Sequence, residues 1–316
     1  MKYKYLFGPV PSRRLGVSLG VDLVPLKTCT LDCVYCECGK TTNLTTTRKE
    51  YVPVQAVIAE LGDYLAGNPS LNYITFAGSG EPTLNTGIGA IINFLKNYFP
   101  QYKLCVLTNG TLLTDPAIRF SVERVDLIIP SLDAATEKVF QQVNRPHQVL
   151  NCAAMIDGLI KLRQEYKGKL KLEVFIVPGL NDIPKELSML KKAISSIKPD
   201  HVQLGTLDRP GTEDWVKTAD NRKMKEIALY LGNAELISDF QSRQRIASFN
   251  ESYSSQILKT LLRRPCTIED LQQVLNLHPA EIQKYINYLL ELGKIEMEQK
   301  ERGIFLKIKN TPKGYA

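Results

Sequence analysis

The chain lacks the long apolar segments that mark membrane and secreted proteins. No run of about 18 apolar residues occurs in it, and residues 1–8 mix lysines with aromatics, without an apolar segment followed by a small-residue cleavage site. We therefore expect a protein that neither spans a membrane nor carries a secretory signal, and we place it in the cytoplasm. Internal repeats and low-complexity tracts are also absent, and 316 residues with 44% hydrophobic side chains form an ordinary globular composition.

Dense runs of lysine or arginine are missing as well, although the formal net charge is +7. A basic balance suits RNA or another anionic partner, because positive surface charge attracts polyanions. Charge that is spread evenly along the chain is equally expected of a moderately basic surface without a specific partner. Composition alone leaves both interpretations open.

Cysteine is sparse and its number is odd, with seven residues in the chain. An odd number argues against a disulfide framework, and three of the cysteines recur as C-x-x-x-C-x-x-C at Cys29, Cys33 and Cys36. Such closely spaced thiolates suit an iron–sulfur cluster or zinc. Because iron–sulfur clusters usually have four cysteine ligands, three ligands leave one iron open to a small molecule. Cys38 offers a fourth thiolate, so a structural zinc or fully liganded cluster remains an alternative.

The order of the expected elements predicts an α/β fold. Strand-like runs alternate with segments of helical spacing, and most of these strands end in a polar loop. This alternation predicts a parallel sheet or a partial (β/α)6 barrel, with ligands at the carboxyl ends of the strands. The expected strands are residues 17–24, 73–77, 103–107, 125–130, 169–177 and 201–204, and the expected helices are residues 53–65, 87–98, 116–121, 134–143, 149–165 and 184–197.

The pattern changes near residue 250, which predicts two domains, residues 1–249 and 250–316. The first includes a closing helix and linker within residues 221–249. The second has the outline of a winged helix, with helices at residues 257–264, 268–275 and 279–292 and a hairpin at 294–298 and 303–308. Its presumed recognition helix carries Lys284 as its only basic residue. We therefore expect docking or dimer contacts more than sequence-specific DNA binding.

The cysteine loop resembles the signature of the radical S-adenosylmethionine (radical SAM) enzymes, because Tyr35 places an aromatic residue just before the third cysteine. The resemblance implies that Cys29, Cys33 and Cys36 bind three irons of a 4Fe-4S cluster. It also implies that S-adenosyl-L-methionine chelates the fourth iron through its amino and carboxylate groups. The cluster, reduced by an external electron donor, would then cleave the sulfonium to methionine and a 5′-deoxyadenosyl radical.

Other strand-end loops are similar to motifs of the same family. The Gly78-Ser79-Gly80-Glu81-Pro82 stretch resembles the glycine-rich loop that meets the methionine amino group, and glycines let a backbone approach a ligand closely. Taken alone, such segments are more often turns or helix caps. The resemblance implies that the residues around S-adenosylmethionine are Tyr35, Gly78, Gly80, Glu81, Asn109, Ser131 and Asp133, with Val174 to Val177 as an apolar wall for adenine.

The resemblance extends from Phe7 to Val216, and the segments 7–16 and 207–211 resemble an uncharacterised branch grouped with wybutosine-type tRNA-modifying enzymes. Wybutosine enzymes bind a second cluster through cysteines ahead of the signature, and this chain has none before Cys29. The wybutosine reaction is therefore not expected here. We expect a macromolecular substrate, with RNA ahead of protein because of the basic balance and the likeness to tRNA enzymes.

Several polar and charged residues lie where a substrate could be held. On the Asp208-Arg209 pair, the guanidinium suits a phosphate or carboxylate and Asp208 would orient it. Glu173, within an apolar strand, needs a partner if it faces inward. The substrate-side candidates are Arg145, Asp208 and Arg209, with Arg13, Arg14, Asn144 and His147 as further members of the group.

A different class of function also accounts for the cysteines and the C-terminal outline. The chain could be a non-catalytic iron–sulfur or zinc sensor whose winged helix binds DNA. That hypothesis predicts a fourth protein ligand, most simply Cys38, and gives no role to the glycine-rich loop or to Ser131 and Asp133.

Overall fold

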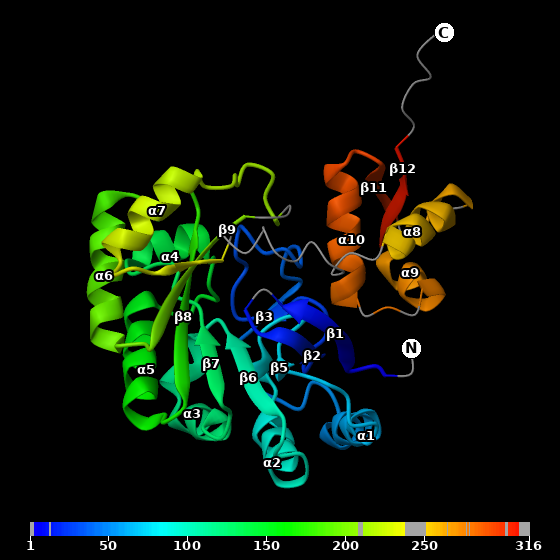
Figure 1. Ribbon diagram of the computed structural model, residues 1–316. Coiled ribbons are helices and arrows are strands. Elements are labelled where there is room, and N and C mark those ends of the chain that lie inside the picture. The colour runs from blue at the N-terminus through cyan, green and yellow to red at the C-terminus, as the bar shows by residue number, and fades with distance from the viewer. Residues whose placement is uncertain are drawn as a thin grey trace.

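The computed structural model describes residues 3–12, 14–207, 211–237, 251–263, 265–275, 277, 279–300 and 303–309. Within these residues an eight-stranded sheet has the order β1-β2-β5-β6-β7-β8-β9-β10 (Figure 1). All neighbours from β2 to β10 pair in parallel, and only β1 pairs antiparallel. The strands are β1 (Leu6–Ser12), β2 (Gly16–Val21), β5 (Tyr73–Phe76), β6 (Lys103–Thr108), β7 (Leu127–Pro130), β8 (Lys169–Ile176), β9 (His201–Thr206) and β10 (Glu235–Leu236).

Helices cover the outer face of this sheet, and side chains from both layers form the main hydrophobic core (Figure 1). In β8 the side chains alternate between fully buried and partly exposed, as expected of a strand with two different faces. The helices are α1 (Val54–Leu65), α2 (Ile88–Tyr98), α3 (Pro116–Val122), α4 (Glu137–Val143), α5 (Cys152–Glu165), α6 (Pro184–Ile197) and α7 (Asn221–Tyr230). The predicted α/β fold with a mainly parallel sheet is confirmed, and each of the strands and helices expected up to residue 204 is present, most of them with shifted bounds.

Four short or irregular strands were not predicted. The edge strand β1 contains Pro9 and Pro11, and proline removes the backbone donor that a central strand needs. An edge strand tolerates it, because one side of the strand has no neighbour. The others are β10 and the small parallel pair β3 (Thr28–Cys29) and β4 (Asn43–Leu44), each two residues long.

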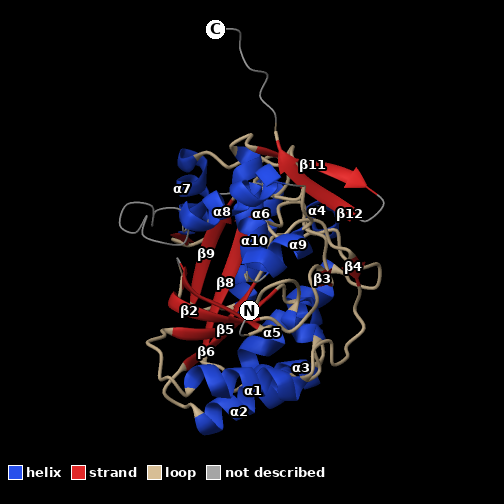
Figure 2. Cartoon of the chain, turned by 90° about the vertical axis from the view of Figure 1, so that its right-hand side faces the viewer, coloured by secondary structure: helices blue, strands red, loops and turns tan. Residues whose placement is uncertain are grey.

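The C-terminal residues have a separate hydrophobic core. Their elements follow the predicted order, with α8 (Glu251–Arg263), α9 (Ile268–Leu275), α10 (Pro279–Glu291), β11 (Ile295–Lys300) and β12 (Gly303–Ile308). Both views place the β11–β12 hairpin at the opposite end of the molecule from α1 and α2 (Figures 1 and 2). The winged-helix assignment stays a prediction, and so does the boundary at 249/250, because residues 238–250 lie outside the described part of the chain.

No helix among the described residues has the length and apolar character needed to cross a membrane.

Candidate functional site

Polar loops at the carboxyl ends of the parallel strands meet on one side of the sheet. The cysteine loop follows β2, the Gly78–Pro82 loop follows β5, Asn109 follows β6 and Ser131 follows β7. Two backbone hydrogen bonds join the first two loops: Lys27 N donates to Ser79 O at 2.7 Å and Glu81 N donates to Thr28 O at 3.2 Å. The sheet topology thus brings together segments that are far apart in sequence.

Both glycines of the Gly78–Pro82 loop are required by contacts within the protein. A Cβ atom on Gly80 would lie 1.8 Å from the carbonyl oxygen of Thr28. Gly78 has φ +143°, and a Cβ there would lie 2.6 Å from the carboxylate carbon of Asp22. These glycines therefore allow the cysteine loop and the buried Asp22 to approach, which is a different reason from the predicted approach of backbone to ligand. Their contact with S-adenosylmethionine stays a prediction.

Each of the three signature thiols accepts a hydrogen bond from a different side chain. The donors are Asn109 Nδ2 to Cys29 Sγ at 3.5 Å, Asn144 Nδ2 to Cys33 Sγ at 3.4 Å, and Lys27 Nζ to Cys36 Sγ at 3.1 Å. Among the described residues, no group of three histidine, cysteine or acidic side chains could hold a metal ion. In a 4Fe-4S cluster each cysteine binds its own iron, so its ligands need not converge on one ion. The three thiols accept hydrogen bonds from three different donors and so have separate surroundings, which fits ligands that each bind a different iron of one cluster.

The surroundings of these thiols differ in their effect on ionisation. Burial raises the pKa of Cys29 to about 11, and burial followed by the charge of Asp133 raises the pKa of Cys33 well above its usual value. The pKa of Cys36 is lowered to about 5, mainly by a hydrogen bond from Cys38, against burial, with further help from Lys27. Cys36 is therefore the thiol that ionises most readily.

Cys38 is the thiol whose role the sequence left open. Its Sγ lies 3.8 Å from the carbonyl oxygen of Gly78, to which it donates, and it also interacts with Cys36. It is thus close to the signature thiols, while the remaining cysteines, Cys105, Cys152 and Cys266, are buried in other parts of the chain. Cys105 and Cys152 are core residues, as predicted.

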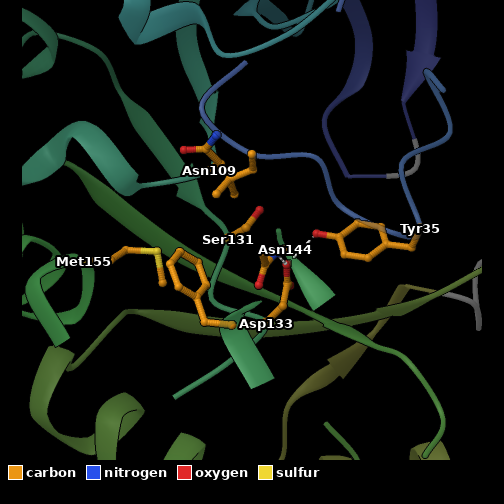
Figure 3. Close-up of a pocket in the computed structure, with 8 residues that line it drawn as sticks. Tyr35, Asn109, Ser131, Asp133, Asn144 and Met155 are labelled. Carbon is orange, nitrogen blue, oxygen red and sulfur yellow. Dashed lines mark hydrogen bonds between the residues drawn. The ribbon is translucent and has the colours of Figure 1, made fainter. Parts of the chain in front are cut away.

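A small pocket beside the cysteine loop gathers four of the predicted S-adenosylmethionine residues (Figure 3). Its free volume is about 10 Å³, roughly the space of one water molecule. A larger ligand therefore requires side chains such as Tyr35 to move. The pocket is lined by Leu31, Tyr35, Asn109, Ser131, Asp133, Phe140, Asn144 and Met155.

The carboxylate of Asp133 accepts three hydrogen bonds in this pocket. Its Oδ1 accepts from the backbone N of Phe175 at 2.8 Å. Its Oδ2 accepts from Tyr35 Oη at 2.5 Å and from Asn144 Nδ2 at 2.7 Å (Figure 3). Burial raises the pKa of Asp133 to about 6, although these hydrogen bonds oppose the shift. Tyr35 is held in place by stacking on Phe175, with ring centroids 3.8 Å apart.

Two polar atoms of the pocket remain available to a ligand. Asn144 Oδ1 is buried and has no hydrogen-bond partner, and the hydroxyl of Ser131 makes no hydrogen bond to any described residue. Buried polar atoms normally have partners, so an unpaired acceptor in a pocket indicates a missing donor. Ribose hydroxyls can donate to Asn144 and Asp133 and accept from Ser131. The residues present therefore fit a nucleoside group.

Glu81 contacts the protein rather than this pocket. Its carboxylate accepts hydrogen bonds from Thr83, from Thr108 Oγ1 at 2.7 Å and from the backbone N of Asn109 at 2.7 Å. Burial raises the pKa of Glu81 against the effect of these hydrogen bonds. Glu81 thus fixes the ends of β5 and β6 relative to each other, and its contact with S-adenosylmethionine stays a prediction.

The side chains of the predicted apolar wall at Val174 to Val177 lie on both faces of β8 and the residue after it. Val174 and Ile176 are fully buried in the main core, because alternate side chains of a strand point to opposite faces. Phe175 lies on the other face and stacks on Tyr35. Within the predicted range, Phe175 is therefore the side chain on the face of Tyr35, and its contact with adenine stays a prediction.

The substrate-side candidates are only partly described. Arg145 pairs with Glu213 through a charged hydrogen bond, while Asp208 and Arg209 lie outside the described residues. Glu173 has the partner that a partly buried carboxylate needs, because Arg14 Nη1 lies 2.5 Å from its Oε2. These partners come from β8 and from the turn between β1 and β2.

Glu173 belongs to a row of side chains that crosses the sheet. It is in register with Ser131 on one side and with Gln203 of β9 on the other, and Gln203 is in register with Glu235. The side-chain oxygen of Gln203 is buried without a partner. Sequence patterns could not find this row, because it depends on the register of neighbouring strands.

Helix α10 of the C-terminal residues contacts the cysteine loop. Asn287 of α10 donates through Nδ2 to the carbonyl oxygen of Glu37 at 2.6 Å, and the charge of Lys284 on the same helix acts on Cys38. The loop that carries the candidate cluster ligands is therefore covered on one side by α10.

Comparison with known proteins agrees with this arrangement. The model of the radical SAM superfamily matches residues 23–190, which include the cysteine loop and all strands from β5 to β8. The chain belongs to the radical SAM superfamily. Members of this family use a 4Fe-4S cluster and S-adenosylmethionine. The protein is therefore a radical SAM enzyme, whose specific reaction the comparisons leave open.

The chain is also similar to individual proteins over most of its length. The UPF0026 protein MJ1312 of Methanocaldococcus jannaschii is 28% identical over 95% of this chain and 95% of its own length. A protein of Brachyspira hyodysenteriae named GTPase Obg is 35% identical over 94% of this chain, but the chain spans only 44% of that relative. Among solved structures, a radical SAM methyltransferase from Sphaerobacter thermophilus superposes with a TM-score of 0.52, at 17% identity, over 69% of this chain and 64% of its own. This last similarity shows the fold alone.

Proposed function

We propose that the enzyme binds a 4Fe-4S cluster through Cys29, Cys33 and Cys36 and S-adenosylmethionine in the adjoining pocket. When bound, the cluster would supply one electron for the cleavage of S-adenosylmethionine to methionine and a 5′-deoxyadenosyl radical, and that radical would abstract hydrogen from an RNA or protein substrate. One observation carries the proposal: the thiols of the signature, each with its own hydrogen-bond donor, lie beside a pocket with unpaired polar atoms.

The pocket residues divide the binding of S-adenosylmethionine among them. Asp133 and Asn144 accept from ribose hydroxyls, and Ser131 supplies a free hydroxyl as donor or acceptor. Tyr35 moves away from Asp133 to admit the ligand, because the pocket has free space for about one water molecule. Asn109 spans both parts of the site, since it lines the pocket and donates to Cys29.

The substrate would lie along the row that includes Glu173 and Gln203. Arg14 keeps further N–H groups for a ligand beyond the one that it donates to Glu173, and Gln203 offers an unpaired carbonyl oxygen. Such a mixture of donors and acceptors suits the edge of a nucleobase. The net charge of +7 favours RNA over protein, and Arg145 and Arg209 remain candidates for its phosphates.

The alternative of a non-catalytic sensor receives no support from the relatives or the solved structures. It also gives no role to the unpaired atoms of Asn144 and Ser131 beside the thiols.

Anaerobic reconstitution with iron and sulfide, followed by S-adenosylmethionine and a strong reductant, tests the proposal directly. We expect 5′-deoxyadenosine and methionine in equal amounts, and none from Cys36→Ala. An intact cluster that forms no 5′-deoxyadenosine would contradict the proposal.

The class of substrate can be tested separately. An extract that contains RNA and protein is added to the reconstituted enzyme, and the rate of 5′-deoxyadenosine formation is compared after ribonuclease or protease treatment of the extract. RNA as substrate predicts stimulation that ribonuclease abolishes. Stimulation that only protease abolishes would show a protein substrate instead.

A further inference from the structure

Lys27 is a buried ammonium group beside a candidate cluster ligand. It is 6% exposed, and its Nζ donates to Cys36 Sγ at 3.1 Å. No described residue offers it a carboxylate partner, and Cys36 is the only hydrogen-bond partner of Nζ among these residues. Burial of a charge is costly unless an opposite charge compensates it. The anionic group that this cation faces is therefore the thiolate of Cys36, together with the cluster that Cys36 would help to hold.

The backbone around Lys27 fixes the direction of its side chain. Its φ of 57° lies in the left-handed region, which a lysine rarely adopts. Its N–H donates to Ser79 O at 2.7 Å, and its carbonyl oxygen accepts from the N–H groups of Thr42 and Asn43, each at 3.1 Å. An uncommon conformation that several hydrogen bonds enforce is typical of a functional position. The loop thus holds the ammonium against Cys36 in a defined place.

The other two signature thiols receive hydrogen bonds of a different kind. Their donors, Asn109 and Asn144, are neutral amides. A charged donor makes a stronger hydrogen bond than a neutral one. Its positive charge also stabilises the state of the cluster that carries one more electron, and in a buried site water screens this effect only weakly.

We propose that Lys27 is a positioning residue that raises the reduction potential of the cluster through its charge on Cys36, which makes reduction by the electron donor easier. This proposal rests on the proposed function, because it requires that Cys29, Cys33 and Cys36 hold a cluster. Lys27 was not singled out by the sequence, since it lies outside the cysteine pattern and matches no family motif.

The test is an anaerobic redox titration of the reconstituted full-length protein, followed by the electron paramagnetic resonance signal of the reduced cluster. Lys27→Met removes the charge at similar size, Lys27→Gln keeps an N–H donor without charge, and Lys27→Arg keeps the charge. Lys40→Met is the matched control, because Lys40 is an exposed lysine of the same loop. Iron content and circular dichroism are measured for every variant.

We expect the midpoint potential to become more negative in Lys27→Met and Lys27→Gln, and to stay close to that of the original protein in Lys27→Arg and Lys40→Met. Equal potentials in all variants would overturn the proposal, and so would a similar shift in Lys40→Met. It would also be wrong if both neutral variants fold but hold no iron, because the charge would then serve cluster binding. Failure of the unchanged protein to bind a cluster would instead refute the proposed function.

Discussion

Asp133 links burial to ligand binding at the scale of a single residue. Burial raises its pKa to about 6 from an ordinary 3.8, so the folded protein favours the protonated form. The group therefore favours the folded state at low pH, and this contribution is lost as pH rises through about 6. The binding of S-adenosylmethionine should depend on pH in the opposite direction. The ionised carboxylate has all its lone pairs available to accept hydrogen bonds from ribose hydroxyls, whereas the protonated form does not.

We expect the affinity for S-adenosylmethionine to fall as pH decreases below the pKa of Asp133. At pH 5.5 about a quarter of a group with a pKa of about 6 is ionised, so binding should be roughly fourfold weaker than at pH 7.5. Equilibrium dialysis under anaerobic conditions measures this affinity. Asp133→Asn should bind weakly at every pH without a step near 6, and an unchanged profile in that variant would show that another group titrates.

The two thiols of the Cys36-Glu37-Cys38 stretch should respond differently to substitution. Cys36→Ala removes a predicted ligand, and we expect it to lose most of the iron and all 5′-deoxyadenosine formation. Cys38→Ala removes only the hydrogen bond to Cys36 and the contact with Gly78, so we expect nearly full iron content. Iron analysis and absorption spectra compare the two variants. Loss of iron in Cys38→Ala would identify it as the fourth ligand and revive the sensor hypothesis.

The sequence predicted which residues meet beside the cysteine loop, but it did not predict the hydrogen bonds that surround the cysteines. Tyr35, Asn109, Ser131 and Asp133 meet in one pocket, as strand-end residues of a parallel sheet should. The hydrogen bond from Lys27 to Cys36 could not be predicted, because it depends on a left-handed backbone at Lys27 that no motif indicates.

At the scale of elements, the close contact between two loops makes Gly80 sensitive to substitution. We expect Gly80→Ala to lower the stability by about 2 kcal/mol or more, because the added Cβ would overlap the carbonyl oxygen of Thr28 and force the loops apart. Iron content should fall with it. Thermal unfolding followed by circular dichroism provides the measurement.

Gly62→Ala is the matched control for this effect. Gly62 lies inside α1, and a Cβ there would meet only Phe94 Cζ at 3.9 Å, which is an ordinary contact. Alanine is favoured over glycine within helices by about 0.5–1 kcal/mol, so the control should be slightly more stable. A similar loss of stability in both variants would show that the loop contact is not the cause.

Elements with a clear hydrophobic periodicity could be predicted from the sequence. Elements whose position depends on pairing with another strand could not. Strands β5 to β8 are short apolar runs between polar loops, and their place in the sheet followed from β-α alternation. The edge strand β1 has the wrong composition for a strand because of its prolines. Its position depends on pairing with β2, which sequence reasoning on one segment does not include.

At the scale of the whole molecule, the sequence indicated two structural units but not how they meet. Apolar periodicity indicated the helices of the C-terminal region, and these residues do form a separate core. The hydrogen bond between Asn287 and Glu37 joins positions 250 residues apart. Such a contact depends on tertiary packing, and neither segment alone contains a signal for it.

The contact between α10 and the cysteine loop should protect the cluster from the solvent. Asn287 donates to the carbonyl oxygen of Glu37, between Cys36 and Cys38, so its loss removes one tie that holds α10 over this loop. A hydrogen bond of this kind contributes about 1 kcal/mol to stability. Its loss should therefore raise roughly fivefold the fraction of molecules in which α10 has moved away from the cysteine loop. We expect iron to leave Asn287→Ala several-fold faster in the presence of a chelator, as followed by the decay of cluster absorption. As a control, Glu291→Ala alters an exposed residue of the same helix and should leave the rate of iron loss unchanged. Equal rates of iron loss in the two variants would show that α10 does not shield the cluster.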